Sequence, residues 1–107
     1  MTFSAYSDER LKEHVEAADI DMCYDIIKDL PLSRWKWKEG FGGIDRNKLG
    51  WIAQDVEKIF PKSVNSVNGN LTINGDQIYA TMWGAIRKLQ VLTEALKDAM
   101  SAVTSAP

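Results

Sequence analysis

The sequence predicts an α+β fold in which a small β-sheet with flanking helices precedes one long C-terminal helix. Tryptophans alternate strictly with basic residues over Leu32–Lys38, which is the period of a half-buried strand. From Asp76 onward, apolar residues recur every three to four positions for about seven turns, the spacing of one helix face. At 107 residues with 45% hydrophobic side chains, the chain has the size of a single domain.

The composition narrows the functional classes. The formal net charge is −2, so no overall basic field attracts nucleic acid. Cys23 is the single cysteine, which excludes an internal disulfide and a cysteine-based metal cluster; we expect no metal and no cofactor. No apolar run is long enough to span a membrane, and Met1–Tyr6 lacks the pattern of a secretion signal. We therefore expect synthesis in the cytoplasm, with no membrane and no nucleic acid as partner.

The first part of the chain predicts two helices. Two acidic residues follow Ser7 and suit the positive end of a helix dipole, so a helix is expected from Ser7 to about Glu16. A second helix is expected over Asp19–Leu30 and is ended by Pro31. The apolar face of this second helix consists of Ile20, Cys23, Tyr24 and Ile27.

The middle of the chain predicts, in order, the strand Leu32–Lys38, a glycine-rich loop from Gly40 to about Asn47, a strand over Leu49–Ile52, and a short helix over Gln54–Phe60 that Pro61 ends. The next segment, Ser63–Ile73, contains Asn68-Gly69, the strongest short signal of a β-hairpin. The glycine-rich loop is either a protrusion toward a partner, with Phe41 exposed, or a simple connection between two strands.

The long helix carries a heptad-like seam formed by Ile78, Met82, Ala85, Leu89, Leu92, Leu96, Ala99 and Val103. Ile86 and Val91 widen the apolar surface beyond a two-residue seam. A stripe of this width suits a parallel trimeric helical bundle. It equally suits an ordinary amphipathic helix that covers the core of a monomer. The tail from Ser101 is expected to fray.

Two short stretches point to a function. Ser7–Lys12 reads SDERLK, which places a serine and a lysine five residues apart, and Gly50–Glu57 reads GWIAQDVE. In this order, and followed by a long helix, they resemble the intramolecular chaperone domain at the C-terminus of endosialidase tail spikes, phage neck appendages and other viral fibres. A related domain lies within the myelin regulatory factor. The resemblance runs from about Ser7 to Leu96.

The resemblance implies a self-cleaving chaperone. Ser7 would be the nucleophile, Lys12 its general base and Tyr6–Ser7 the cleaved bond, so the chain would act as a single-turnover serine endopeptidase without other substrates. Residues 1–6 would be a remnant of the upstream fibre, and residues 7–107 the chaperone domain. Its partners would be two further copies in a homotrimer, joined through the C-terminal helix, and the upstream fibre or spike segment of the same polypeptide. The resemblance makes the chain part of a virion tail fibre precursor that is assembled in the host cytoplasm.

The chemistry of this pair sets a geometric condition. A serine hydroxyl needs a base to become nucleophilic, and a lysine serves as that base only when desolvation or a neighbouring cation leaves it neutral. Arg10 is a candidate for that cation. Five residues of ideal helix leave two side chains about 140° apart, so Ser7 has to precede the helix or receive its base from another subunit. Gly50, by its place in the family motif, and Gln54 are candidate supports of the site.

Other interpretations stay open at this point. Ser7 is alternatively a helix cap and Lys12 a solvated side chain. For the whole domain, the alternatives are a trimerisation or adhesion module that never cleaves, and the self-processing domain of a membrane-tethered transcription factor. Arg34–Lys38 also matches the interleaved basic and aromatic residues of single-stranded nucleic-acid sites. Its alternation, however, puts the two kinds of residue on opposite faces, which favours a half-buried strand.

Overall fold

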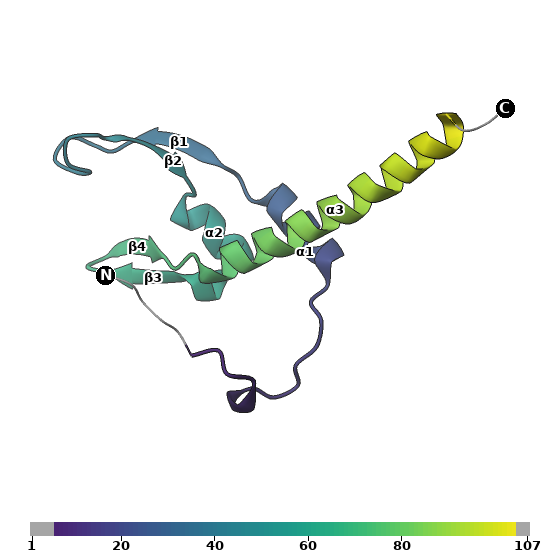
Figure 1. Ribbon diagram of the computed structural model, residues 1–107. Coiled ribbons are helices and arrows are strands. Elements are labelled where there is room, and N and C mark those ends of the chain that lie inside the picture. The colour runs from purple at the N-terminus through teal and green to yellow at the C-terminus, as the bar shows by residue number, and fades with distance from the viewer. Residues whose placement is uncertain (1–5, 105–107) are drawn as a thin grey trace.

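The computed structural model describes residues 6–104 and confirms the α+β class. Within these residues the elements are the 3₁₀ turn η1 (Glu9–Leu11), helix α1 (Ile20–Asp29), strands β1 (Ser33–Lys36) and β2 (Asn47–Gly50), helix α2 (Ala53–Ile59), the 3₁₀ turn η2 (Pro61–Ser63), strands β3 (Val64–Val67) and β4 (Asn70–Ile73), and helix α3 (Asp76–Thr104). Figure 1 shows α3 as the long axis, with α1 against its first half and the two strand pairs at one end.

Helix α1 packs along the first half of α3. Asp19 begins α1 by accepting hydrogen bonds from two backbone N–H groups of the first turn, as an N-cap does. The two helices approach so closely that a Cβ atom at Gly84 would lie 2.5 Å from Cys23 Sγ. On the surface, Lys88 Nζ of α3 forms an ion pair with Asp21 of α1 at 2.7 Å. The predicted helix over Asp19–Leu30 is therefore confirmed, and its half-buried face lies on α3.

A small core lies where α1, α2 and α3 meet. Its buried members are Leu30, Val56, Phe60 and Ile78, and the half-buried side chains around them are Ile26, Trp51, Ile59, Val64 and Ile73. Ile78 belongs to the first turn of α3. The core therefore supports only the beginning of α3 and leaves the far end of that helix without cover from its own chain.

The strands form two separate antiparallel ribbons in place of a single small sheet. β1 pairs with β2, and β3 pairs with β4. The predicted Asn68-Gly69 turn is confirmed, because both residues have a positive φ, 51° and 81°, as a type I′ turn requires. The β1–β2 ribbon with its loop, Ser33–Gly50, projects from the core in Figure 1 and is called the arm below.

The molecule is far more extended than its length requires. Its radius of gyration is 19.4 Å, whereas a compact domain of this length has about 13 Å. Three parts project from the core: the segment before α1, the arm, and the C-terminal half of α3 (Figure 1). No helix in the stretch from residue 6 to residue 104 has the length and apolar character needed to cross a membrane.

The predicted helix from Ser7 to about Glu16 is wrong. Only η1 forms there; Lys12 is extended, and His14 has a φ of +52°, which a right-handed helix excludes. A short helix is marginal on its own because its nucleus is costly. Every residue over 6–19 is exposed, so no packing offsets this cost. Elsewhere, β2 begins and ends two residues earlier than expected, and α3 continues to Thr104 through the tail that was expected to fray.

The close contact between α1 and α3 can be tested with Gly84→Ala. The new Cβ atom would lie 2.5 Å from Cys23 Sγ and 2.8 Å from Cys23 Cβ, so the helices must separate. Although alanine favours helix, we expect the free energy of unfolding to fall by about 1–3 kcal/mol in denaturant titrations. Cys23→Gly removes the obstructing atoms, so it should cost less stability in the Gly84→Ala background than in the unmutated chain. Equal costs in both backgrounds would contradict the close contact.

Candidate functional site

The segment before α1 contains one tight turn that is specified locally. Asp8 caps η1, because its Oδ1 accepts a hydrogen bond from the Arg10 backbone N–H at 2.9 Å. Two backbone bonds of 3.0 Å close the turn, from Leu11 N–H to the Asp8 carbonyl and from Lys12 N–H to the Glu9 carbonyl. Aspartate favours such turns because its carboxylate can bond the backbone two residues further on. The turn therefore forms without contacts from the rest of the chain.

The turn brings Ser7 and Lys12 together. Lys12 Nζ donates a hydrogen bond to Ser7 Oγ at 2.9 Å. Ser7 lies before the turn, and Lys12 leaves it in an extended conformation with φ −116° and ψ 149°, so the lysine side chain can reach back. The condition derived from the sequence, that Ser7 precede the helical residues, is met by a 3₁₀ turn in place of a helix. The distance is short enough for direct proton transfer between a hydroxyl and an amine.

Arg10, the predicted neighbouring cation, is paired with Asp8, whose carboxylate offsets its charge. Arg10 Nη2 donates to Asp8 Oδ2 at 2.7 Å, and Arg10 Nε donates to Asp8 Oδ1 at 3.1 Å. Through its side-chain and backbone hydrogen bonds, Arg10 holds the pKa of the Asp8 carboxyl below its ordinary value, while Asp8 raises the pKa of Arg10. Because the pKa of Asp8 is depressed, the contribution of this pair is present above the ordinary pKa of a carboxyl and is lost as pH falls through the lowered value.

The Ser7–Lys12 pair is open to water in a single chain. All residues over 6–19 are exposed, and Figure 1 shows this segment as a loop that extends away from the other elements. The hydrogen bonds of residues 6–12 within the described chain stay inside that segment. Peptide cleavage also needs donors for the oxyanion of the tetrahedral intermediate. The described part of one copy thus brings together a candidate nucleophile and base.

Gly50 and Gln54, the predicted supports, lie at the base of the arm and not beside Ser7. Gly50 ends β2, and a Cβ atom there would lie 3.1 Å from the Trp35 ring, so the glycine lets the indole pack against the backbone. Gln54 is exposed on α2 and lines a groove of about 490 Å³ between the arm and the β3–β4 hairpin. Within residues 6–104, the structure joins Ser7 to Lys12 but does not bring these two supports to them.

This arm–hairpin groove is the main feature that the sequence did not predict. It is lined by Lys36, Trp37, Lys38, Phe41, Ala53, Gln54, Asn70 and Leu71. The alternation in the strand predicted that both tryptophans would be covered, yet Trp37 is 41% exposed. Phe41 is 60% exposed, as the protrusion interpretation of the loop expected. A Cβ atom at Gly42 would overlap the Trp37 ring, so the glycine loop folds against Trp37. One feature of the sequence could have indicated this exposure. Trp37 is next to a glycine-rich loop, at the end of a strand, where few neighbouring residues are available to cover its side chain.

The apolar stripe of α3 divides into a covered half and an uncovered half. Ile78 is 0% exposed and Ala85 is 6% exposed, so both face their own core, and their predicted place in a seam between chains is corrected. After Lys88, every described residue of α3 is exposed. Five large apolar side chains are exposed along this part of the helix and are called the distal stripe: Leu89, Leu92, Leu96 and Val103 of the predicted seam, and Met100, which was not in it. Ala99 of the predicted seam is exposed as well. A row of large exposed apolar side chains marks an interaction surface; Met82, between the two halves, is 36% exposed.

A comparison with protein families matches residues 7–65 to a peptidase family described as chaperone of endosialidase. The match begins at Ser7, includes the Ser7–Lys12 turn, α1, the arm and α2, and ends within β3. Helix α3 lies outside it, so the match does not extend to Leu96 as the sequence resemblance did. It spans more than half of the 107 residues and contains both motifs that carried the resemblance. The chain therefore belongs to the chaperone of endosialidase family.

Proposed function

We propose that three copies of this chaperone domain assemble at the C-terminal ends of three viral fibre or spike chains, support their folding, and then cleave themselves off between Tyr6 and Ser7. The observation that carries the proposal is the 2.9 Å hydrogen bond between Lys12 Nζ and Ser7 Oγ, at the residue where the family match begins. A serine held against a lysine by a dedicated turn suits a nucleophile and its base. The helix-cap interpretation of Ser7 is weakened, because Asp8 caps η1.

The proposed reaction uses the two side chains, hydrogen-bond donors for the oxyanion and water. Neutral Lys12 Nζ takes the proton from Ser7 Oγ as that oxygen attacks the Tyr6 carbonyl carbon. The Ser7 amide nitrogen then leaves and takes the proton from Lys12, so Tyr6 becomes joined to Ser7 Oγ by an ester. Water hydrolyses the ester, leaving a carboxylate on Tyr6 and a free amine and hydroxyl on Ser7.

The distal stripe supports the assembly part of the proposal. Its five large apolar side chains lack cover from their own chain, and contact with further copies would bury them. The copies would run parallel, since they follow equivalent ends of parallel fibre chains. Fibres of intertwined β-strands fold slowly, because non-local contacts come only after large loop-closure costs. A trimeric chaperone domain raises the local concentration of the three fibre strands. Its removal after folding makes the fibre kinetically stable, because the trimer that would support refolding is gone.

The cleavage proposal predicts the fate of a fibre segment fused before Met1. The unmutated fusion should be cut between Tyr6 and Ser7, and mass spectrometry should find Ser7 as the new N-terminus. Ser7→Ala removes the nucleophile and should abolish cutting while assembly persists. Lys12→Arg should also abolish it, because an arginine does not give up its proton near neutral pH. Cutting by Ser7→Ala, or a new N-terminus at another residue, would overturn the assignment of Ser7.

The assembly proposal predicts the effect of a charge in the distal stripe. Leu96→Asp would place an unpaired carboxylate in the apolar contact between chains, and burying such a charge costs free energy. The mass from light scattering should therefore fall from that of three chains to that of one. Gln90→Asp is the matched control, since it adds the same charge to an exposed position outside the stripe, and it should stay trimeric. A monomeric mass for the unmutated chain at micromolar concentration would contradict the proposed trimeric assembly.

Substitutions that weaken the Asp8 cap of η1 should slow cleavage in steps. Asp8→Ala removes both the bond to the Arg10 backbone N–H and the pair with the Arg10 side chain, so Lys12 should be held near Ser7 for less of the time. We expect a several-fold slower cut in fusion assays, with Asp8→Asn in between because an asparagine can still cap. Equal rates for Asp8→Ala and the unmutated fusion would show that the turn does not position the pair.

A further inference from the structure

The arm–hairpin groove has the character of a peptide-binding surface. Trp37 and Phe41 expose large aromatic faces into it, and Leu71 adds an aliphatic wall. Lys36 and Lys38, both exposed, stand at its border. Aromatic side chains are enriched where proteins bind one another, and the two lysines favour an occupant that carries negative charge. The groove thus suits a segment with apolar side chains between acidic ones.

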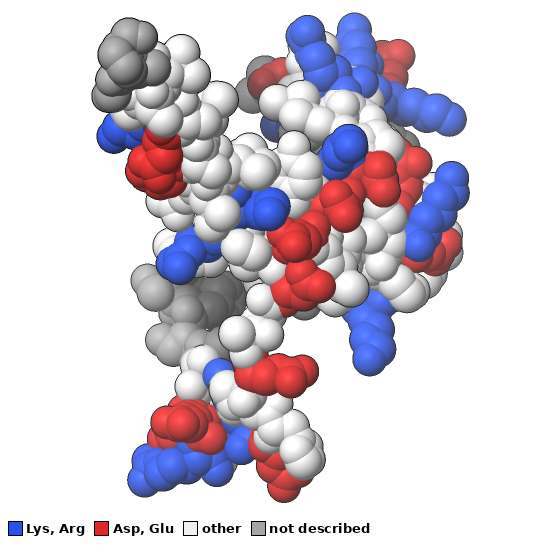
Figure 2. Space-filling view, turned by 90° about the vertical axis from the view of Figure 1, so that its right-hand side faces the viewer, with Lys and Arg blue, Asp and Glu red and all other residues white. Residues whose placement is uncertain are grey.

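The charge of the whole arm points to the same kind of occupant. Ser33–Gly50 contains five Lys or Arg residues and two acidic residues, an excess of three positive charges. Figure 2 shows Lys and Arg side chains gathered at the top right of the molecule, at the height of the arm in Figure 1. The chain as a whole is acidic, with a formal charge of −2. The arm is therefore a local basic surface on an acidic protein, which favours anionic partners over neutral ones.

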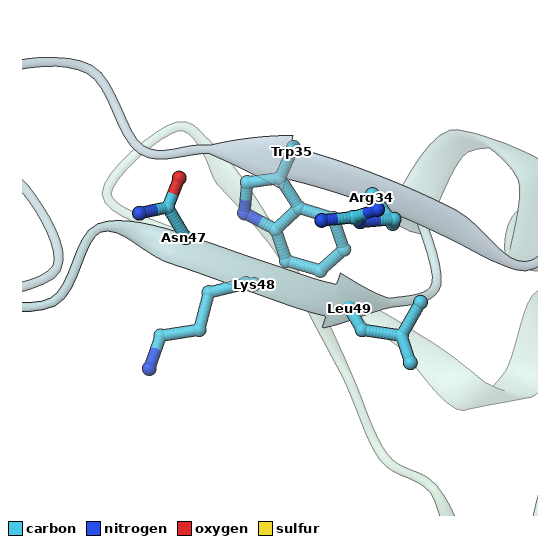
Figure 3. Close-up of a pocket in the computed structure, with 5 residues that line it drawn as sticks. All are labelled: Arg34, Trp35, Asn47, Lys48 and Leu49. Atoms are coloured by element: carbon cyan, nitrogen blue, oxygen red, sulfur yellow. The ribbon is translucent and has the colours of Figure 1, made fainter.

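The arm also holds a hydrogen-bond donor without a partner. Trp35 Nε1 is buried, and none of the described residues accepts a hydrogen bond from it. An unpaired buried donor destabilises a structure. The Trp35 side chain also lines a second hollow of about 420 Å³ in the arm, with Arg34 and Lys48 among the other lining residues (Figure 3). These two cations add to the positive charge of the arm and favour an anionic occupant.

The segment before α1 has the complementary composition. Its residues Tyr6–Glu16 include four acidic and two basic ones, an excess of two negative charges that is opposite in sign to the excess of the arm. Its apolar side chains, Tyr6, Leu11 and Val15, are all exposed, so nothing in its own chain uses them. Figures 1 and 2 both place this segment at the bottom of the molecule and the arm near the top. A chain in this conformation cannot fill its own groove with it.

We propose that Tyr6–Glu16 of one copy docks into the arm–hairpin groove of a neighbouring copy. This inference rests on the proposed self-cleavage for its purpose and extends it by naming the surface that receives the cleaved segment. Docking would cover Ser7 and Lys12, remove water from them, and bring them to the Gln54 that lines the groove of the neighbour. Each chain would then cleave its own Tyr6–Ser7 bond only when the groove of a neighbour receives it, and a single copy would be inert.

The first test measures docking without cleavage. In the full chain carrying Ser7→Ala, amide hydrogen exchange of residues 6–16 should be slow in the assembly and fast on dilution to monomers. Adding Lys36→Glu with Lys38→Glu should speed this exchange by about tenfold or more, because the groove then repels the segment. Lys62→Glu with Arg87→Glu is the matched control; both residues are exposed and neither lines the groove. It should leave the exchange unchanged. Unaltered protection in the groove variant would overturn the proposal.

A charge swap separates a direct contact from an indirect effect. Glu9→Lys with Glu13→Lys alone should also lose protection. Combined with the reversed groove, these changes should restore protection, since opposite charges again face one another. Failure of the combination to restore it would show that the segment does not lie against the two lysines.

The last test asks which copy supplies the groove. Fusions with intact Ser7 but the reversed groove are mixed with fusions that carry Ser7→Ala and an intact groove. Docking between copies predicts that the first kind is cut in mixed assemblies and uncut alone, whereas absence of cutting in the mixture would overturn docking in a neighbour. The exchange readout keeps the two proposals apart: groove-dependent protection without any cleavage would refute self-cleavage alone, and cleavage without groove-dependent protection would refute docking alone.

Discussion

The apolar stripe of α3 is longer than the core of its own chain that can cover it, and the proposed assembly depends on this mismatch in length. The 29 residues of α3 meet their own core only through the first turns, where Ile78 and Ala85 are buried. A domain of this size buries a limited share of its surface. Because two ribbons and the segment before α1 use part of the chain, fewer residues remain to form the core. A free helix end with large apolar side chains gains most of its stability from packing on a partner. The fold of one copy thus leaves an apolar surface exposed, which the proposed assembly would cover.

The candidate site divides in the same way between one chain and several. The contact between Ser7 and Lys12 is accompanied by the Asp8 cap and by backbone bonds inside the same short segment, so its described hydrogen bonds are all local. All described residues of this segment are exposed in one copy, whereas a lysine serves as a general base only where desolvation or a neighbouring cation leaves it neutral. This division would keep unassembled chains uncut and reserve the chemistry for the assembly.

The sequence predicted those elements whose causes are local. The Asn68-Gly69 turn, the helix over Asp19–Leu30 and the beginning of α3 were all predicted from neighbouring residues, and the structure has them. The helix from Ser7 to Glu16 failed because propensity does not suffice without packing. The buried position of Ile78 and the exposed ring of Trp37 could not be predicted, since they depend on which elements meet in space. The seam pattern correctly marked one face of α3 but could not say how far the core of its own chain would reach along it.

Coupling between assembly and chemistry is the central claim, and the cleavage rate of a fibre fusion at different concentrations tests it most directly. The rate per chain would be measured across the range in which light scattering shows the assembly dissociating. The account predicts that this rate falls in proportion to the assembled fraction, because a lone Ser7–Lys12 pair remains solvated. A rate per chain that stays constant while the chains become monomers would contradict the account.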